Sequence, residues 1–159
     1  MRGYTLLEIV VYVSILAVIA VLVVGSILSI YQAFAKTKVE RRLALNGDVA
    51  METIIRDVRA AESFDAGVSV FGTSPGVLQI NISGSTEKFS LSGAVLQVQK
   101  GGPTENLTSS DVSVTNLIFY ATSTDNSKMI KVEFTLEAGS GKFQKTKNFY
   151  GSAVMRGAY

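Results

Sequence analysis

The residues with the clearest potential for chemistry lie near the start of the chain, in Gly3-Tyr4-Thr5-Leu6-Leu7-Glu8-Ile9. Glu8 is an acid at the edge of residues 9–35, which include no charged residue. A carboxylate at such a position either stays hydrated at the level of the lipid headgroups or meets a cation. If the chain is cut after Gly3, Tyr4 carries a free α-amino group, which is largely protonated at neutral pH. On a neighbouring copy, shifted along the helix axis, that amine could pair with Glu8.

The apolar residues 9–35 set the position of this acid. They are dominated by Ile, Val, Leu and Ala, and the run is longer than the ~20 residues that cross a bilayer core as a helix. Inside hydrocarbon a segment must satisfy its own backbone hydrogen bonds, so we predict a membrane helix. The alternative is a secretory signal peptide, because Ala33-Phe34-Ala35 matches an A-x-A cleavage site. Against it, a signal peptide has an apolar core of only ~7–15 residues and positive charge where this chain has Glu8.

The composition narrows the possible chemistry further. The chain has 159 residues, of which 47% are hydrophobic, and a formal net charge of +2, which does not by itself indicate a nucleic-acid partner. It has neither cysteine nor histidine, so disulfides, thiol chemistry and nucleophile–histidine catalysis are excluded. The usual zinc, copper and haem sites lack their main ligands. We therefore expect no catalytic residues, no metal site and no cofactor, and predict that the protein is not an enzyme.

After the apolar run, residues 31–61 keep a helical pattern but become amphipathic. The apolar positions fall on one face: Val39, Leu43, Ala50, Ile54, Val58 and Ala61. The charged positions occupy other faces: Arg41, Arg42, Asp48, Glu52, Arg56 and Asp57. Glu52 and Arg56 have the spacing of a helical ion pair, and Gly47 weakens the helix locally. We predict that turn residues around Ser63, Asp65 and Gly67 end this stem.

The remainder of the chain shows short alternating segments separated by Gly, Ser, Asn and Asp. Residues 77–82 predict one strand, and residues 88–91 and 94–99 predict a hairpin across Ser92-Gly93. Residues 116–121 and 129–136 predict a second pair joined by a loop, with residues 142–150 as a third strand beside 129–136. Such strands have one apolar face that needs a cover. The predicted fold class is α+β, with the stem helix packed on an antiparallel sheet.

Charged residues in the strand region have structural interpretations. We expect Glu133 on a strand and Glu137 in the loop after it, which does not suit paired acid–base catalysis. Asp111 and Asp125 are expected in turns. Lys142, Lys145 and Lys147 give the last strand a basic character that could meet DNA, but lysines that guard a solvated sheet edge are the preferred interpretation. The basic cluster in residues 36–42 is interpreted as an anchor at the headgroup level.

The run from Gly3 to Ile9 resembles the type IV prepilin signature. That signature is a glycine before the cut, an aromatic first mature residue, Thr-Leu, an aliphatic residue, then Glu and a long apolar helix. Residues 56–61 are similar to the end of this helix in J-type pseudopilins and W-type minor pilins, and residues 152–157 to the closing strand of minor pseudopilins. The chain departs from many major pilins in having Gly25-Ser26 near the place of a helix-bending proline, and its leader is short.

The resemblance implies a structural subunit, a minor pilin or pseudopilin of a type IV pilus or type II secretion-like filament. It implies cleavage between Gly3 and Tyr4 by a prepilin peptidase, N-methylation of Tyr4, and pairing of Glu8 with the Tyr4 amine of an adjacent subunit. The expected regions are the leader 1–3, the membrane and assembly helix 4–35, the stem 36–62 and the β-rich head 63–159. The expected partners are other subunits, the peptidase/N-methyltransferase and inner-membrane assembly machinery.

The same resemblance implies a single-pass inner-membrane protein with an extracytoplasmic head before assembly, and a pilus or pseudopilus afterwards. The basic residues that follow the apolar run would, on a bare positive-inside count, keep the head in the cytoplasm. The alternative function is a secreted or membrane-tethered adhesion or binding domain whose N-terminus is only a targeting signal. In the secreted form of this alternative, residues 4–35 would be absent from the mature chain.

Overall fold

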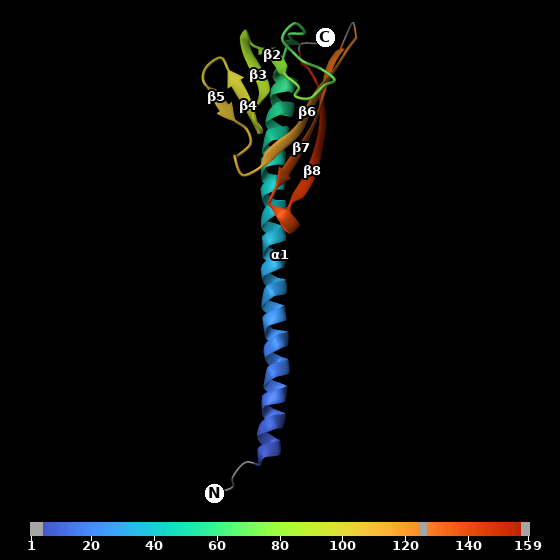
Figure 1. The fold of residues 1–159 in the computed structure, drawn as a ribbon. Coiled ribbons are helices and arrows are strands. Elements are labelled where there is room, and N and C mark those ends of the chain that lie inside the picture. The colour runs from blue at the N-terminus through green and yellow to red at the C-terminus, as the bar shows by residue number, and fades with distance from the viewer. Residues whose placement is uncertain (1–4, 125–126, 157–159) are drawn as a thin grey trace. The chain divides into compact units, whose positions relative to one another are not determined.

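The computed structural model describes residues 5–124 and 127–156, and its first element is the helix α1, Leu6–Ala60 (Figure 1). The chain divides into two compact units, Met1–Lys38 and Val39–Tyr159. The first unit contains the apolar part of α1. The second contains the amphipathic stem together with all the strands, which confirms the predicted α+β fold class.

The apolar part of α1 satisfies its own polar groups. The hydroxyls of Ser14, Ser26 and Ser29 each donate to the backbone carbonyl four residues earlier, at 2.7–2.9 Å. This back-bonding leaves no hydroxyl of these serines in need of water, which is the condition for a helix inside hydrocarbon. Gly25, near the predicted weak point, lies within the continuous helix.

The stem buries the face that its periodicity predicts. Val39, Leu43, Ala50, Ile54, Val58 and Ala61 are all buried. Two further positions on the stem are also buried, Gly47 and Asp57. The prediction that Asp57 lies on a polar face is therefore wrong, because a partner from the strands, described below, neutralises its charge. The predicted pairing of Arg56 with Glu52 is replaced by a contact of Arg56 Nε with Asp57 Oδ1 at 3.2 Å.

The strands form two antiparallel sheets, whereas the sequence predicted one. The five-stranded sheet has the order β1-β2-β3-β4-β5: β1 Ser63–Phe64, β2 Leu78–Ile82, β3 Ser85–Ser92, β4 Val95–Lys100 and β5 Thr104–Asn106. The three-stranded sheet has the order β6-β7-β8: β6 Ser113–Thr124, β7 Ser127–Ala138 and β8 Lys145–Val154. The short β1 and β5 went unpredicted because two or three residues are too few to show alternation.

The predicted hairpins are confirmed, with shifted ends. The turn between β3 and β4 is centred on Gly93-Ala94, since Gly93 adopts a left-handed φ of 61°. The ladder between β6 and β7 extends to the pair Thr124–Ser127, so most of the predicted loop is strand. The strand β8 pairs with β7 as predicted but begins three residues late, because Gly141–Phe143 forms a 3₁₀ turn, η1. Its last residues, up to Val154, include part of the tail segment compared with a closing strand.

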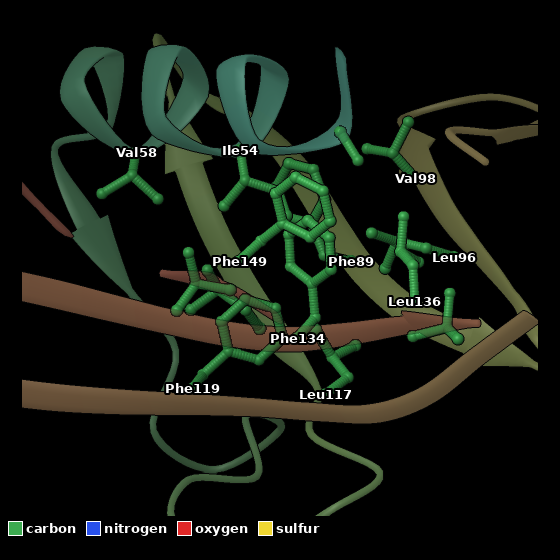
Figure 2. Close-up of a cluster of buried hydrophobic side chains, with 14 of the residues drawn as sticks. Ile54, Val58, Phe89, Leu96, Val98, Leu117, Phe119, Phe134, Leu136 and Phe149 are labelled. Carbon is green, nitrogen blue, oxygen red and sulfur yellow. The ribbon is translucent and has the colours of Figure 1, made fainter. Parts of the chain in front are cut away.

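One hydrophobic core joins the stem to both sheets within the second unit (Figure 2). The stem contributes Ile54 and Val58, which face a cluster of side chains from the strands. These are Phe89, Leu96 and Val98 from the five-stranded sheet, and Leu117, Phe119, Phe134, Leu136 and Phe149 from the three-stranded sheet. Burial of each large apolar side chain stabilises the fold by about 1.5–3 kcal/mol. The stem is therefore the cover that the apolar sheet faces require.

Candidate functional site

The first candidate site is the beginning of α1. Thr5 precedes the helix, and its Oγ1 accepts a hydrogen bond from the backbone N–H of Glu8 at 3.3 Å. This is the side-chain half of a capping box, in which Ser or Thr is followed three residues later by Glu. The carboxylate of Glu8 lies in the first turn, where the positive end of the helix dipole favours negative charge. The residues that begin the helix thus also orient its only acid before the stem.

The carboxylate of Glu8 has a neutral donor on its own helix. The hydroxyl of Tyr12 donates to Glu8 Oε1 at 3.1 Å, one helical turn further on. Tyr12 was not singled out from the sequence, although a spacing of four residues places two side chains on one helix face. Gly3 and Tyr4, the predicted cleavage pair, lie outside the described residues, so the geometry of the Tyr4 amine relative to Glu8 is not part of the described structure.

The side chains that follow Glu8 are apolar and exposed on every side of the helix. Large hydrophobic residues between Leu6 and Phe34 are 47–81% exposed. The segment contains a window with mean hydropathy 2.9 of which nothing is buried, and the helix is long and apolar enough to cross a membrane. A helix that is apolar all round needs an apolar environment, either lipid or neighbouring helices. Within the described residues, this apolar surface is therefore left without a packing partner.

The second candidate site is an ionic cluster between the stem and the five-stranded sheet. Lys100 Nζ on β4 lies 2.6 Å from Asp57 Oδ2 on α1 and 3.4 Å from Glu87 Oε2 on β3. The side chain of Asp57 is 8% exposed and that of Glu87 is 14% exposed. Glu87 Oε2 itself is buried and makes no hydrogen bond with any described residue. Two carboxylates thus share one ammonium group.

This arrangement shifts the pKa values of Glu87 and Lys100. Burial, and next the negative charge of Asp57, raise the pKa of Glu87, and the attraction of Lys100 only partly offsets them. Burial lowers the pKa of Lys100, but the hydrogen bond from Lys100 to Asp57 and the two negative charges raise it by more, so that its pKa lies above the ordinary value. Lys100 therefore stays charged, and Glu87 takes up a proton at a higher pH than an ordinary glutamate does.

The remaining predicted acids have structural partners. Glu133 accepts from Lys131 at 2.5 Å on the outer face of the three-stranded sheet, and this hydrogen bond raises the pKa of Lys131. Glu137 lies on β7 itself and not in the loop after it, because the ladder to β8 extends through Ala138. Asp111 pairs with Arg42 of the stem at 3.2 Å. Asp125 lies outside the described residues.

The search for a metal site in the described part of the chain gives a negative result. Among residues 5–124 and 127–156, no group of three or more acidic side chains could hold a metal ion. A hollow of about 480 Å³ beside the end of the stem is lined by Arg56, Arg59 and Arg156 together with Glu52. It places no nucleophile beside a base. Lysine already fills the space between the two buried carboxylates of the ionic cluster.

A scan against protein-family models and searches of curated proteins and of solved structures found no match to this chain. The chemistry of the candidate sites therefore rests on their own residues. Of the sequence-predicted site residues, Glu8 is placed at the capped start of an exposed apolar helix. The ionic cluster was missed because its three members are far apart in the sequence and separately resemble solvated charges.

Proposed function

We propose that this protein is a type IV pilin-like structural subunit, a minor pilin or pseudopilin that is held in a membrane by α1 and polymerises through it. The observation that carries the proposal is the run from Gly3 to Ile9, followed at once by an exposed apolar helix. In a filament, the apolar faces of neighbouring copies would replace the lipid around each helix. The protein would perform no reaction of its own.

The environment of Glu8 supports this proposal energetically. An ionised carboxylate on an apolar helix is costly away from water unless a cation compensates it. The hydroxyl of Tyr12 supplies one hydrogen bond but no positive charge. Cleavage after Gly3 would supply a protonated amine on every copy. A neighbouring copy that brings its Tyr4 amine to Glu8 would therefore neutralise the acid, and would also fix the axial offset between subunits.

The test is mass spectrometry of the mature N-terminus after co-expression of the full chain with a prepilin peptidase. The expected product begins at Tyr4 and carries one added methyl group on its amine. A matched control is Gly3→Leu, which should leave the leader in place, since the resemblance requires glycine before the cut. A wild-type product that begins at Lys36 would instead identify a discarded signal peptide, and the filament proposal would fall.

A further inference from the structure

The strand β8 runs beside the stem (Figure 1). A Cβ at Gly139, two residues before η1, would lie 3.2 Å from Val39 Cγ2. Lys145 Nζ lies 3.6 Å from Glu40 Oε1. Further along, the backbone N–H of Arg156 donates to the carbonyl of Arg59 at 3.2 Å. These contacts fix which end of β8 accompanies the beginning of the stem.

The beginning of β8, where Lys145 meets Glu40 of the stem, carries a group of basic side chains. We name the basic rim as Lys142 of η1 and Lys145 and Lys147 of β8, all of them exposed. Glu40 is an acid beside it, and Glu40 Oε1 lies 3.6 Å from Lys145 Nζ, with both side chains exposed. Such an exposed ion pair contributes little to stability. Glu137, opposite Thr146 on β7, is a further acid near this end.

Covalent connection keeps this rim close to a membrane that holds the apolar helix. Val39 is the first residue of the second unit, and only residues 36–38 separate it from the end of the uncharged run at Ala35. Four Cα–Cα steps span at most about 14 Å even when the chain is fully extended. An anionic lipid surface attracts basic residues within about one Debye length, ~8–10 Å at physiological salt.

We infer that the basic rim is a docking surface for the headgroups of anionic phospholipids, which holds the head against the bilayer that its own helix spans. The inference rests on the membrane-spanning part of the proposed function, and is independent of cleavage and of filament assembly. The ammonium groups of Lys142 and Lys147 lie 5.1 and 5.0 Å from the ring centroids of Phe143 and Phe149, so each of these charges sits over an aromatic ring.

The experiment uses the full chain reconstituted into phosphatidylcholine vesicles with or without phosphatidylglycerol. Because the chain has no cysteine, Gln144→Cys provides a single fluorophore site at the rim, and Ser152→Cys provides a reference site further along β8. A nitroxide on lipid headgroups quenches a fluorophore that lies against the surface. Resistance to alkaline extraction first establishes that each variant is inserted.

In vesicles that contain phosphatidylglycerol, we expect strong quenching at position 144 and weak quenching at position 152. The quenching at position 144 should be lost without phosphatidylglycerol and should decrease at high salt. A variant with Lys142, Lys145 and Lys147 all changed to Gln should lose docking. Each lysine near an anionic surface strengthens binding about fivefold, so the docked-to-free ratio should fall on the order of a hundredfold. The matched control changes Lys88, Lys128 and Arg156 to Gln, which removes the same charge away from the rim and should retain docking.

The outcomes separate the inference from the proposed function. An inserted chain whose quenching at position 144 does not depend on phosphatidylglycerol would overturn the docking surface and leave the filament proposal intact. Equal loss of docking in the two triple variants would also overturn it, because net charge and not the rim would then be responsible. Extraction of the chain by alkali would contradict both the proposal that α1 spans the membrane and the docking surface, which depends on that proposal.

Discussion

The ring of Phe149 on β8 packs directly on the backbone of α1 at Gly47, and occupies the space that a Cβ at position 47 would need. The other side of the contact is fixed as well, because Phe149 stacks on Phe134 with ring centroids 5.1 Å apart. Glycine at position 47 is thus a packing requirement of the helix–sheet contact, and not only a weak point in the stem. Any side chain there must displace β8 or reorganise the aromatic pair.

Gly47→Ala is expected to destabilise the head. Alanine favours a helix over glycine by about 1 kcal/mol, but overpacking a well-packed core costs about 1–3 kcal/mol. We therefore expect a net loss of up to about 2 kcal/mol in the free energy of unfolding. Urea unfolding in detergent, followed by near-ultraviolet circular dichroism, measures this change. The double variant with Phe149→Leu should recover part of the loss, whereas a stabilising Gly47→Ala would contradict the contact.

Asp57→Asn is expected to destabilise the contact between the stem and the five-stranded sheet. It removes the charge that accepts from Lys100 at 2.6 Å, and hydrogen bonds to charged groups contribute about 1.5–3 kcal/mol. The control is Asp48→Asn on the exposed side of the same helix, where a change within about 0.5 kcal/mol is expected. Equal losses in the two variants by urea unfolding would show that Asp57 has no special role.

Glu87 should make the head more stable as the pH falls from neutral toward the ordinary glutamate range. The pKa of Glu87 is raised in the folded state above its model-compound value of 4.5, so between these two values the folded chain binds more protons than the unfolded chain. Stability therefore falls with rising pH across that window. The contribution of Glu87 is fully present below about pH 4.5 and is lost as the pH rises through the folded pKa.

Glu87→Gln isolates this effect, since glutamine cannot titrate. The difference in unfolding free energy between Glu87→Gln and the wild type should vary with pH above 4.5. The wild type should become less stable relative to Glu87→Gln as the pH rises. Glu105→Gln, at an exposed position on β5, is the matched control for the same change of side chain outside the cluster. A constant difference for Glu87→Gln would show that the cluster does not couple to protons.

Glu8→Val should leave membrane insertion unchanged and impair incorporation into filaments, by roughly tenfold or more if the lost pairing is about 1.4 kcal/mol. Tyr12→Phe is the matched control, because it removes the 3.1 Å hydrogen bond but retains the carboxylate. Sheared filaments and membranes from the native cells, quantified by immunoblot, report the two steps separately. Normal incorporation of the Glu8→Val variant into filaments would contradict the proposed pairing of Glu8 with a neighbouring amine.

Helix periodicity and strand alternation are local properties, so both parts of α1 and most strand cores were predictable. The apolar stem positions that were predicted to share one face, from Val39 to Ala61, are all buried. The acid Glu8 and the uncharged run behind it were equally visible, since they depend only on neighbouring residue types. The ends of helices and strands were predicted less well. The start of β8 is an example, because the short 3₁₀ turn before it has little sequence signal.

Local sequence patterns therefore specify the kind of each element: an apolar helix, an amphipathic stem and short antiparallel strands. The absence of histidine and cysteine chemistry can also be read from the residues alone. The contacts between elements, in contrast, follow from the tertiary structure. It divided the strands into two sheets, buried Asp57 against Lys100, set Phe149 on Gly47 and brought Lys145 to Glu40. Each of these joins residues far apart in the chain, and their proximity depends on how the stem and sheets close one common core, which no local pattern encodes.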